Sequence, residues 1–375
     1  MVSSRGGSDG RLWGKMVYFL MLAGLIIGIC HLLPRSLPGR PLSACLFIIV
    51  GFIAAQGALS GVITALGLTP RGPLHDVLEY ITDYDGDRPV VLLVGSSFTQ
   101  QGVDPEVLAG TLGASGRNVA VLSLAIGGLS HLERLHYLKE YLANARRLPQ
   151  LVLFEIAGGY DNGPLFQLQQ MRFSDRMIAM MDGTSAWWAF RWLFSGDGAG
   201  LTTTRFALAG DILAHLGLHV GHVGFLWNST PAKQPTGYDP RVLPPKVQHF
   251  TDDEVSRLVD QAARTRDLRA DWPQNVPTNW MRAFLEAEIS TFNRHGIDRF
   301  AFYSVPSMQG ANAAYARRFC AAFSDSTCIV GEDPRLLAGL QRDLDWFDFD
   351  HLHGEGRRLY TLWLGDRLLA SDILP

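Results

Sequence analysis

The chain has 375 residues, which is enough for one large domain or two ordinary ones. Only 18% of the residues are charged, against a usual share of about 25%, and the first 70 residues account for much of this deficit. The net charge is −3 and the sequence pI is about 6.4, so the chain lacks the basic character of nucleic-acid-binding proteins and we expect no nucleic-acid partner.

Two apolar stretches lie at the start of the chain. Residues 16–33 are long enough to span a bilayer as a helix, and residues 42–66 form a second stretch rich in Gly, Ala and Ser. A cleaved signal peptide is the alternative for the first stretch, but it lacks a small-x-small cleavage site. We therefore expect residues 1–70 to form a membrane anchor of two transmembrane helices in a lipid bilayer. Basic residues are nearly balanced between the two sides, which leaves the orientation open.

From about residue 75 onward, short apolar runs alternate with helical periodicity. The runs have strand length, and they lie at residues 90–94, 119–124, 151–156 and 299–303. The helical patterns lie at residues 129–142, 280–292, 313–323 and 356–369. Strands separated by helices predict a mainly parallel sheet covered on both faces, so we expect one α/β domain over residues 75–375.

The alternation breaks between about residues 165 and 276. This stretch is too long for a structureless loop, so we interpret it as an insertion that forms a lid, a substrate groove or a membrane-facing cap. Within it, His215 and His219 are four residues apart and could share a helix face as metal ligands. Gly217 and Gly221 weaken that helix and no acidic ligand follows closely, so we expect no metal site.

Two cysteines lie near the end of the predicted domain. Cys320 and Cys328 are eight residues apart, at a point where a helix end can fold back onto a strand. A disulfide between them would indicate an oxidising compartment. Two reduced thiols in the core are the alternative, and the sequence does not decide between them.

A pair of hydroxyls stands at the end of the first predicted strand. The apolar run of residues 90–94 stops at Gly95-Ser96-Ser97, with no polar residue to lengthen the connection. In parallel sheets, ligands bind at the carboxyl ends of the strands, so this turn presents a hydroxyl where a ligand would lie. Serine is also a favoured N-cap residue, and a helix cap is the structural alternative for Ser97.

Two candidate bases for that serine lie near the C-terminus. A serine is a poor nucleophile unless a base takes its proton and a third group orients the base. The segment DFDHLH contains two overlapping Asp-x-x-His units, Asp348 with His351 and Asp350 with His353. On a turn that enters a helix, this spacing can place the carboxylate against Nδ1 and leave Nε2 for the serine. A satisfied core histidine is the structural alternative for His351.

These two segments resemble the first and last blocks of the SGNH (GDSL-like) hydrolase superfamily. That family has a nucleophilic Ser in a Gly-x-Ser turn and an Asp-x-x-His-Leu sequence, typically with a Gly five residues beyond the His. GSSFTQQGVDP matches the first block with Ser97 as the nucleophile, and Ser96 stands where Asp is common. Because Gly356 lies five residues after His351, the resemblance selects His351 and Asp348 as the catalytic pair.

The oxyanion hole is the least complete part of the resemblance. VLSLAIGGLSHLERL is similar to the second block, with Gly128 as the backbone N–H donor and Gly127 as its neighbour. The third block usually reads Gly-x-Asn-Asp, but FEIAGGYDNGP has Tyr160 in place of the Asn, and Asn162 follows two residues later. The resemblance therefore implies donors at Ser97 and Gly128, with Tyr160 or Asn162 as a substitute. Loss of one donor costs roughly 2.7–4 kcal/mol of transition-state stabilisation.

The resemblance spans residues 90 to about 369 and implies a flavodoxin-like three-layer sandwich preceded by transmembrane helices. Together with the expected membrane anchor, the resemblance favours one group of the superfamily, the DltD-like and AlgX/AlgJ-like proteins of the cell envelope. It implies a serine esterase or O-acyltransferase that acts on acyl esters, above all acetyl, of a cell-envelope polysaccharide, without a cofactor. The alternative is a catalytically silent scaffold, or a polysaccharide-binding component of an O-acylation complex.

The same resemblance implies a location and partners. The protein would lie in the bacterial inner (cytoplasmic) membrane, with its catalytic domain in the periplasm or outside the cell. Its partners would be a polysaccharide or another acylated envelope polymer, and a membrane O-acyltransferase that supplies the acyl group.

Overall fold

The computed structural model describes residues 51, 74–157, 163, 165–170, 174–195, 204–220, 246, 248–265 and 276–375. The chain divides into two compact units. One, the α/β unit, comprises Asp76–Pro164 and Gln234–Pro375. The other comprises Met1–His75 and Leu165–Lys233, and its described part is helical.

A parallel sheet of five strands forms the centre of the α/β unit in the described part of the chain. The strands are β1 (Val90–Gly95), β2 (Ala120–Ala125), β3 (Leu151–Glu155), β4 (Phe300–Ser304) and β5 (Thr327–Val330). Their order is β2-β1-β3-β4-β5, and every neighbouring pair is parallel. This is the strand order of flavodoxin-like sheets, in which ligands bind outside the carboxyl ends of the strands.

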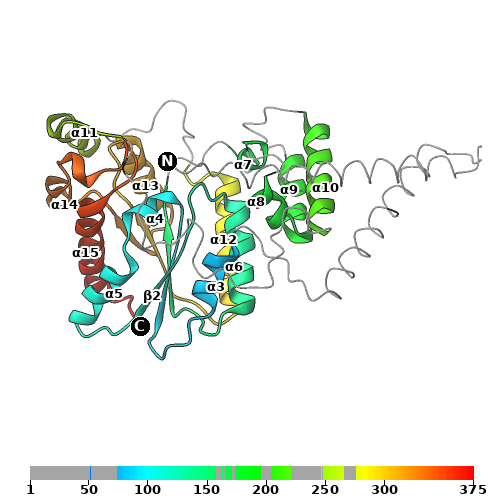
Figure 1. Ribbon diagram of the computed structural model, residues 1–375, viewed down its shortest axis with the longest axis horizontal. Helices are drawn as coiled ribbons and strands as arrows, with labels where there is room; N and C mark the ends of the chain where they lie inside the picture. Colours follow the sequence, from blue (N-terminus) through cyan, green and yellow to red (C-terminus); the bar gives the residue numbers. More distant parts are fainter. Residues whose placement is uncertain are drawn as a thin grey trace, which may run out of the picture. The chain divides into compact units, whose positions relative to one another are not determined.

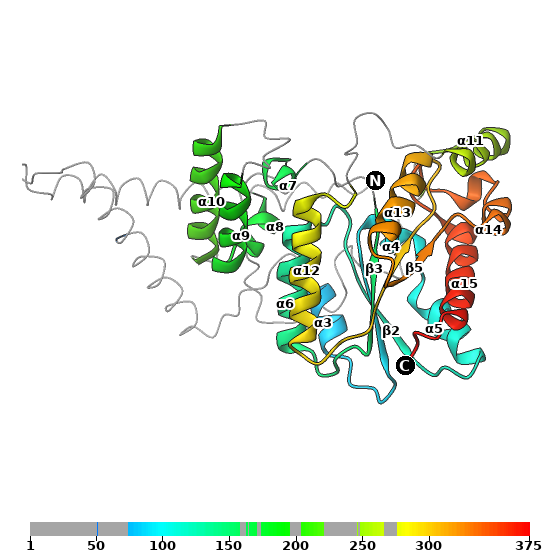
Figure 2. The same ribbon diagram turned by 180° about the vertical axis from the view of Figure 1, so that it is seen from behind.

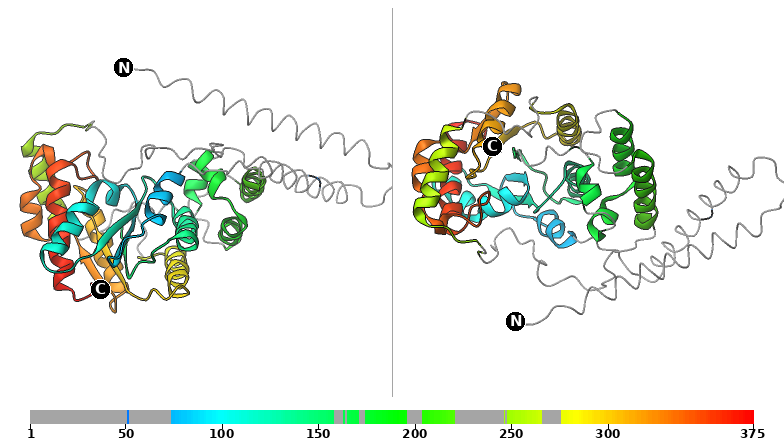
Figure 3. Two further views of the ribbon diagram at one scale, coloured as in Figure 1. Left: turned by 60° about the horizontal axis from the view of Figure 1, so that its bottom comes forward. Right: turned by 90° about the horizontal axis from the view of Figure 1, so that it is seen from above.

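Helices cover both faces of this sheet. α6 (His131–Asn144) packs beside α12 (Asn279–Asn293) on one face, and α5 (Pro105–Ala114) packs beside α15 (Gly354–Ala370) on the other (Figures 1, 2 and 3). The other helices in the described part of the unit are α3 (His75–Thr82), α4 (Ser97–Gly102), α11 (Asp252–Arg264), α13 (Gly310–Ala322), α14 (Pro334–Gly339) and the 3₁₀ helix η2 (Asp343–Asp345). The three layers expected from the alternating pattern are therefore present.

The sequence of the central strand follows from this arrangement. All six residues of β1 are buried, because helices lie on both faces and strands pair with both edges. Val91 and Leu93 belong to the core beneath α5 and α15, where Leu108 and Leu364 meet them. A continuous apolar run, rather than an alternating one, is what such a doubly covered strand requires.

The fold-class prediction was wrong where it placed transmembrane helices before this sandwich. No helix among the described residues is both long and apolar enough to cross a membrane. The longest of them, α15, has 17 residues and carries several charged side chains, whereas a bilayer needs about 20 mostly apolar residues. Apart from residue 51, the predicted spans at residues 16–33 and 42–66 lie outside the described residues. The fold class that the structure supports is the α/β sandwich alone.

The stretch interpreted as an insertion is helical where it is described up to residue 220. Its helices are α7 (Phe166–Gln170), α8 (Asp175–Met180), α9 (Gly183–Phe194) and α10 (Arg205–Val220). α10 packs on α8 and α9. Further along the chain, α11 belongs to the α/β unit and packs on α13 and α14.

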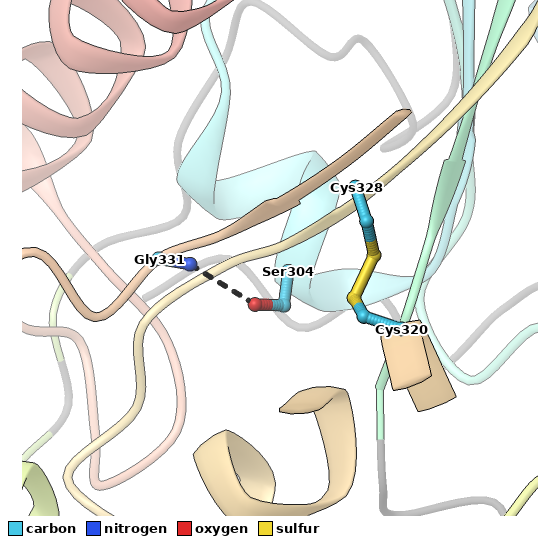
Figure 4. The surroundings of a disulfide bond; sticks show 4 residues. All are labelled: Ser304, Cys320, Cys328 and Gly331. Atoms are coloured by element: carbon cyan, nitrogen blue, oxygen red, sulfur yellow. Dashed lines mark hydrogen bonds between the residues drawn. A yellow bond between two sulfur atoms is a disulfide. The ribbon is translucent and has the colours of Figure 1, made fainter. Parts of the chain in front are cut away.

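A disulfide joins Cys320, in α13, to Cys328, in the edge strand β5 (Figure 4). This decides between the two states that the sequence left open. On the same strand pair, the Gly331 N–H donates to the Ser304 hydroxyl at 3.1 Å, so the end of β5 is held to β4 by a side chain as well (Figure 4). The disulfide therefore fastens α13 to an edge strand of the sheet.

Replacing both cysteines with serine should lower the free energy of unfolding by about 2.5 kcal/mol, because the bond closes a short loop in the unfolded chain. Urea unfolding of the variant and of the wild type measures this difference. Reductant should lower the stability of the wild type to that of the variant and leave the variant unchanged. Equal midpoints for the oxidised wild type and the variant would contradict the expectation.

Candidate active site

The turn after β1 presents Ser97 rather than burying it in a cap. Ser96 is the N-cap residue of α4, and its hydroxyl accepts the Phe98 N–H at 3.3 Å. Ser97 is the first helical residue, and its side chain is free of that capping role. The alternative that Ser97 only caps the helix is therefore wrong.

A loop near the C-terminus brings a base to this serine. Nε2 of His351 lies 2.7 Å from Oγ of Ser97. Nδ1 of the same ring lies 2.8 Å and 2.9 Å from the two carboxylate oxygens of Asp348. The three residues form a continuous line of hydrogen bonds between segments 254 residues apart in the chain.

The backbone of the loop sets the position of the acid and the base. Oδ1 of Asp348 also accepts the backbone N–H groups of Asp350, at 2.8 Å, and of His351, at 2.9 Å. Trp346 and Leu352 pair across the loop in an antiparallel bridge, and both are fully buried. The loop is thus anchored in the core on both sides of the pair that it carries.

The surroundings of the imidazole favour one protonation pattern. An Nδ1–H that donates to Asp348 leaves Nε2 as the acceptor of the Ser97 hydroxyl proton, which is the arrangement of a general base. The Phe98 ring lies 4.9 Å from the His351 ring and packs against it. The side chains of His351 and Asp348 keep 18% and 28% of their surface exposed, so the pair stays accessible from solvent.

The charge of Asp348 is stabilised by its partners. Burial alone would raise the pKa of this carboxyl, but the hydrogen bonds from the His351 ring and the Asp350 N–H outweigh burial and hold the pKa below its usual 3.8. The carboxylate is therefore ionised at neutral pH and can stabilise a protonated His351.

The second Asp-x-x-His unit has a different environment. Asp350 accepts hydrogen bonds from Gln309, at 2.9 Å, and from Asn312, at 3.5 Å. His353 is the N-cap residue of α15, and burial, followed by the charges of Lys246 and Arg357, lowers its pKa. Of the two units, the structure brings only the first to Ser97.

Gly356 has a structural reason to follow His351. A Cβ at this position would lie 2.2 Å from the backbone oxygen of Asp345, a separation that no side chain can adopt without moving the backbone. The first turn of α15 therefore packs directly on the backbone just before the catalytic loop. A larger residue would push the helix and the loop apart.

The glycines after β2 lie beside the nucleophile. A Cβ on Gly127 would be 3.8 Å from Cβ of Ser97 and 3.3 Å from Oε1 of Gln100, whereas one on Gly128 would meet nothing within 4 Å. Gly128 has a φ of +63°, in the left-handed region that favours glycine. The Ser97 N–H, at the start of a helix, has no intrahelical acceptor. Tyr160 and Asn162, the expected substitute donors, lie outside the described residues.

The two histidines considered as metal ligands have backbone partners. Nδ1 of His215 lies 2.6 Å from the carbonyl oxygen of Asp211, and Nδ1 of His219 lies 3.0 Å from that of Ile178. Within the described ranges, no group of three or more His, Cys, Asp or Glu side chains is placed to hold a metal ion.

Glu155, which the sequence reasoning missed, lies beneath the serine turn. It is the last residue of β3, and its carboxylate accepts the backbone N–H groups of Ser96 and Thr99. The only signal in the sequence is one acidic residue at the end of the apolar strand LVLFE. Gln100 was missed as well, because nothing local indicates that its side chain lies against Gly127.

No known family model and no curated protein matches this chain. The SGNH resemblance therefore stays a prediction made on short motifs. What the site offers on its own is a hydroxyl, an imidazole and a carboxylate in one hydrogen-bonded line, next to glycines at the end of a neighbouring strand. This arrangement is suited to nucleophilic attack by the serine.

The contribution of Asp348 to stability should depend on pH. Its folded-state pKa is lowered, so the stabilisation is present above the unfolded-state pKa of about 3.9 and is lost as the pH falls through the folded-state value. We expect the difference in free energy of unfolding between the wild type and Asp348→Asn to be largest at pH 6 and to shrink below about pH 4. Urea unfolding across this range measures the difference, and a constant value would contradict the assignment.

Proposed function

We propose that this chain is a serine esterase or O-acyltransferase of the SGNH type, with Ser97, His351 and Asp348 as its catalytic residues. The observation that carries the proposal is the line of hydrogen bonds from Ser97 Oγ to His351 Nε2, at 2.7 Å, and from His351 Nδ1 to Asp348, at 2.8 Å. Each distance lies within the range for a nucleophile, a base and an orienting group.

The reaction follows from this geometry. His351 Nε2 takes the proton of Ser97 as Oγ forms a bond to the carbonyl carbon of the ester, and Asp348 stabilises the imidazolium. The tetrahedral intermediate collapses, its bond to the leaving oxygen breaks, and Nε2 returns the proton to the leaving alcohol. Water or a hydroxyl of an acceptor then attacks the acyl-enzyme by the same steps. This chemistry requires no metal and no cofactor.

The oxyanion would be bound beside Ser97. The Ser97 N–H is one donor, and the backbone N–H of Gly128, after β2, is the second. Gln100 lies beside this backbone with its side-chain oxygen Oε1, an acceptor, toward the Gly127 position, so it is not assigned as an oxyanion donor. Tyr160 and Asn162 remain the candidates for the donor that the altered third block does not provide in its usual form.

The substrate class comes from the resemblance, which favours acetyl esters of a cell-envelope polysaccharide. The disulfide between Cys320 and Cys328 supports an oxidising compartment, such as the periplasm or the exterior of a cell, where such polymers occur. A partially exposed pair of His351 and Asp348 is compatible with a polymeric acyl donor or acceptor that approaches from solvent. A membrane O-acyltransferase that supplies the acyl group is part of this proposal.

A fluorophosphonate probe should label the wild-type chain on Ser97, because the probe reacts with a serine that a neighbouring base activates. Peptide mass spectrometry locates the label, and Ser97→Ala should lose it. No label on a folded wild-type chain would favour the catalytically silent scaffold. Label on Ser96 would mean that the wrong residue of the turn has been assigned as the nucleophile.

The two neighbouring histidines provide a matched comparison. His351→Ala should slow labelling and ester hydrolysis by about 10³-fold or more, since the base is lost. His353→Ala, two positions further along, should leave the rate within a fewfold of the wild type because His353 does not reach Ser97. Rates of hydrolysis of a soluble acetyl ester measure both effects. Equal losses in the two variants would contradict the assignment of the base.

A further inference from the structure

The carboxylate of Glu155 is placed where the chain leaves the sheet. Val94 of β1 pairs with Phe154 of β3, so Glu155 stands one residue beyond this pair, level with the start of the serine turn. Only 8% of the residue is exposed. A buried carboxylate is costly unless hydrogen bonds satisfy it, so its partners indicate what it does.

Four donors on two residues converge on this carboxylate. Oε2 accepts the backbone N–H groups of Ser96, at 3.0 Å, and Thr99, at 2.7 Å. The Ser96 hydroxyl lies 2.5 Å from Oε1, and the Thr99 hydroxyl contacts Oε2. Ser96 precedes Ser97 and Thr99 follows it by two residues. The carboxylate therefore holds the backbone on both sides of the nucleophile.

The network continues into the sheet. The Thr99 hydroxyl donates to Glu155 and lies 2.5 Å from the hydroxyl of Tyr303, which is left as the donor in that contact. Burial, followed by the charge of Glu155, raises the pKa of Tyr303 well above its usual value, so the phenol stays protonated. β3 and β4 thus both contribute side chains that position the turn between β1 and α4.

Gly95 leaves the space that this arrangement needs. A Cβ at residue 95 would lie 2.2 Å from Oγ1 of Thr99 and 2.6 Å from Oε2 of Glu155. Any side chain there would displace the carboxylate from the turn. The glycine, the two hydroxyl residues and the glutamate are therefore parts of one structure.

We propose that Glu155 is the positioning residue of the catalytic serine. It contacts neither Ser97 Oγ nor His351 in the hydrogen-bond network, and it acts by fixing the peptide groups that set the Ser97 N–H and Oγ in place. Its effect on the rate rests on the proposed function of Ser97 as a nucleophile. Ser96 stands where an Asp is common in the motif that the turn resembles. Here Glu155, from the neighbouring strand β3, supplies a carboxylate to the turn instead.

Glu155→Gln should lower kcat by about 100-fold with little change in KM, because the amide directs N–H groups at donors and shifts the turn. A transplanted carboxylate should restore part of this loss. The Ser96 hydroxyl lies 2.5 Å from Oε1 of Glu155, so Ser96→Asp in a Glu155→Ala chain places a carboxylate near the vacated position. As an N-cap residue, an aspartate can also accept the Thr99 N–H.

Glu288→Gln is the matched control. Glu288 is buried, as Glu155 is, but its carboxylate pairs with Arg134 of α6 at 2.8 Å rather than with the turn. This variant should lose thermal stability and retain most of its kcat. If Glu155→Gln loses activity only in proportion to its stability, as Glu288→Gln does, Glu155 is a structural residue and the inference is overturned.

Two readouts separate this inference from the proposed function. If wild-type Ser97 reacts with the fluorophosphonate probe and Glu155→Gln reacts at the same rate, only the inference fails. If wild-type Ser97 does not react, the proposed function fails. Amide hydrogen exchange of the peptide 95–102 then tests whether Glu155 positions the turn. Faster exchange there in Glu155→Gln, but not in Glu288→Gln, would support positioning of the turn, and unchanged exchange would overturn it.

Discussion

The candidate site depends on how the backbone hydrogen bonds are satisfied where β1 leaves the sheet. All residues of this strand are buried, so the N–H groups of the turn emerge where water is scarce and need acceptors from the protein. The Glu155 carboxylate of β3 supplies them to Ser96 and Thr99. Because these bonds hold the turn from below, the Ser97 side chain can point toward the carboxyl edge of the sheet.

The topology then brings a distant loop to the same edge. α15 returns the C-terminal segment to pack beside α5, and the loop before it lies over the end of β1. Trp346 and Leu352 fasten this loop in the core, and the backbone approach at Gly356 fixes where α15 begins. The distance between Ser97 and His351 is thus determined by the packing of a helix pair and not by local sequence.

The spacing of the Asp-x-x-His motif identified Asp348 and His351 as the pair that meets Ser97. This was possible because the acid and the base are only three residues apart in the chain. Four of the strands were predictable from apolar runs, but β5 was not, since it has four residues and only Ile329 is buried. The role of Glu155 was not predictable, because its partners Ser96 and Thr99 lie in the turn after β1, far from Glu155 in the chain. Apolar length alone led to the transmembrane prediction, which no described helix supports.

The separate anchoring of the serine and of the histidine loop has a mechanical consequence. Asp348 and His351 are joined by side-chain and backbone hydrogen bonds within four residues, so they move together. The contact between His351 and Ser97, in contrast, joins the start of α4 to the loop that precedes α15. Gentle loosening of that interface would separate nucleophile from base while the sheet stays intact. Heat or mild denaturant would then break the contact between His351 and Ser97 before the domain unfolds. Cooling would restore this contact without refolding of the domain.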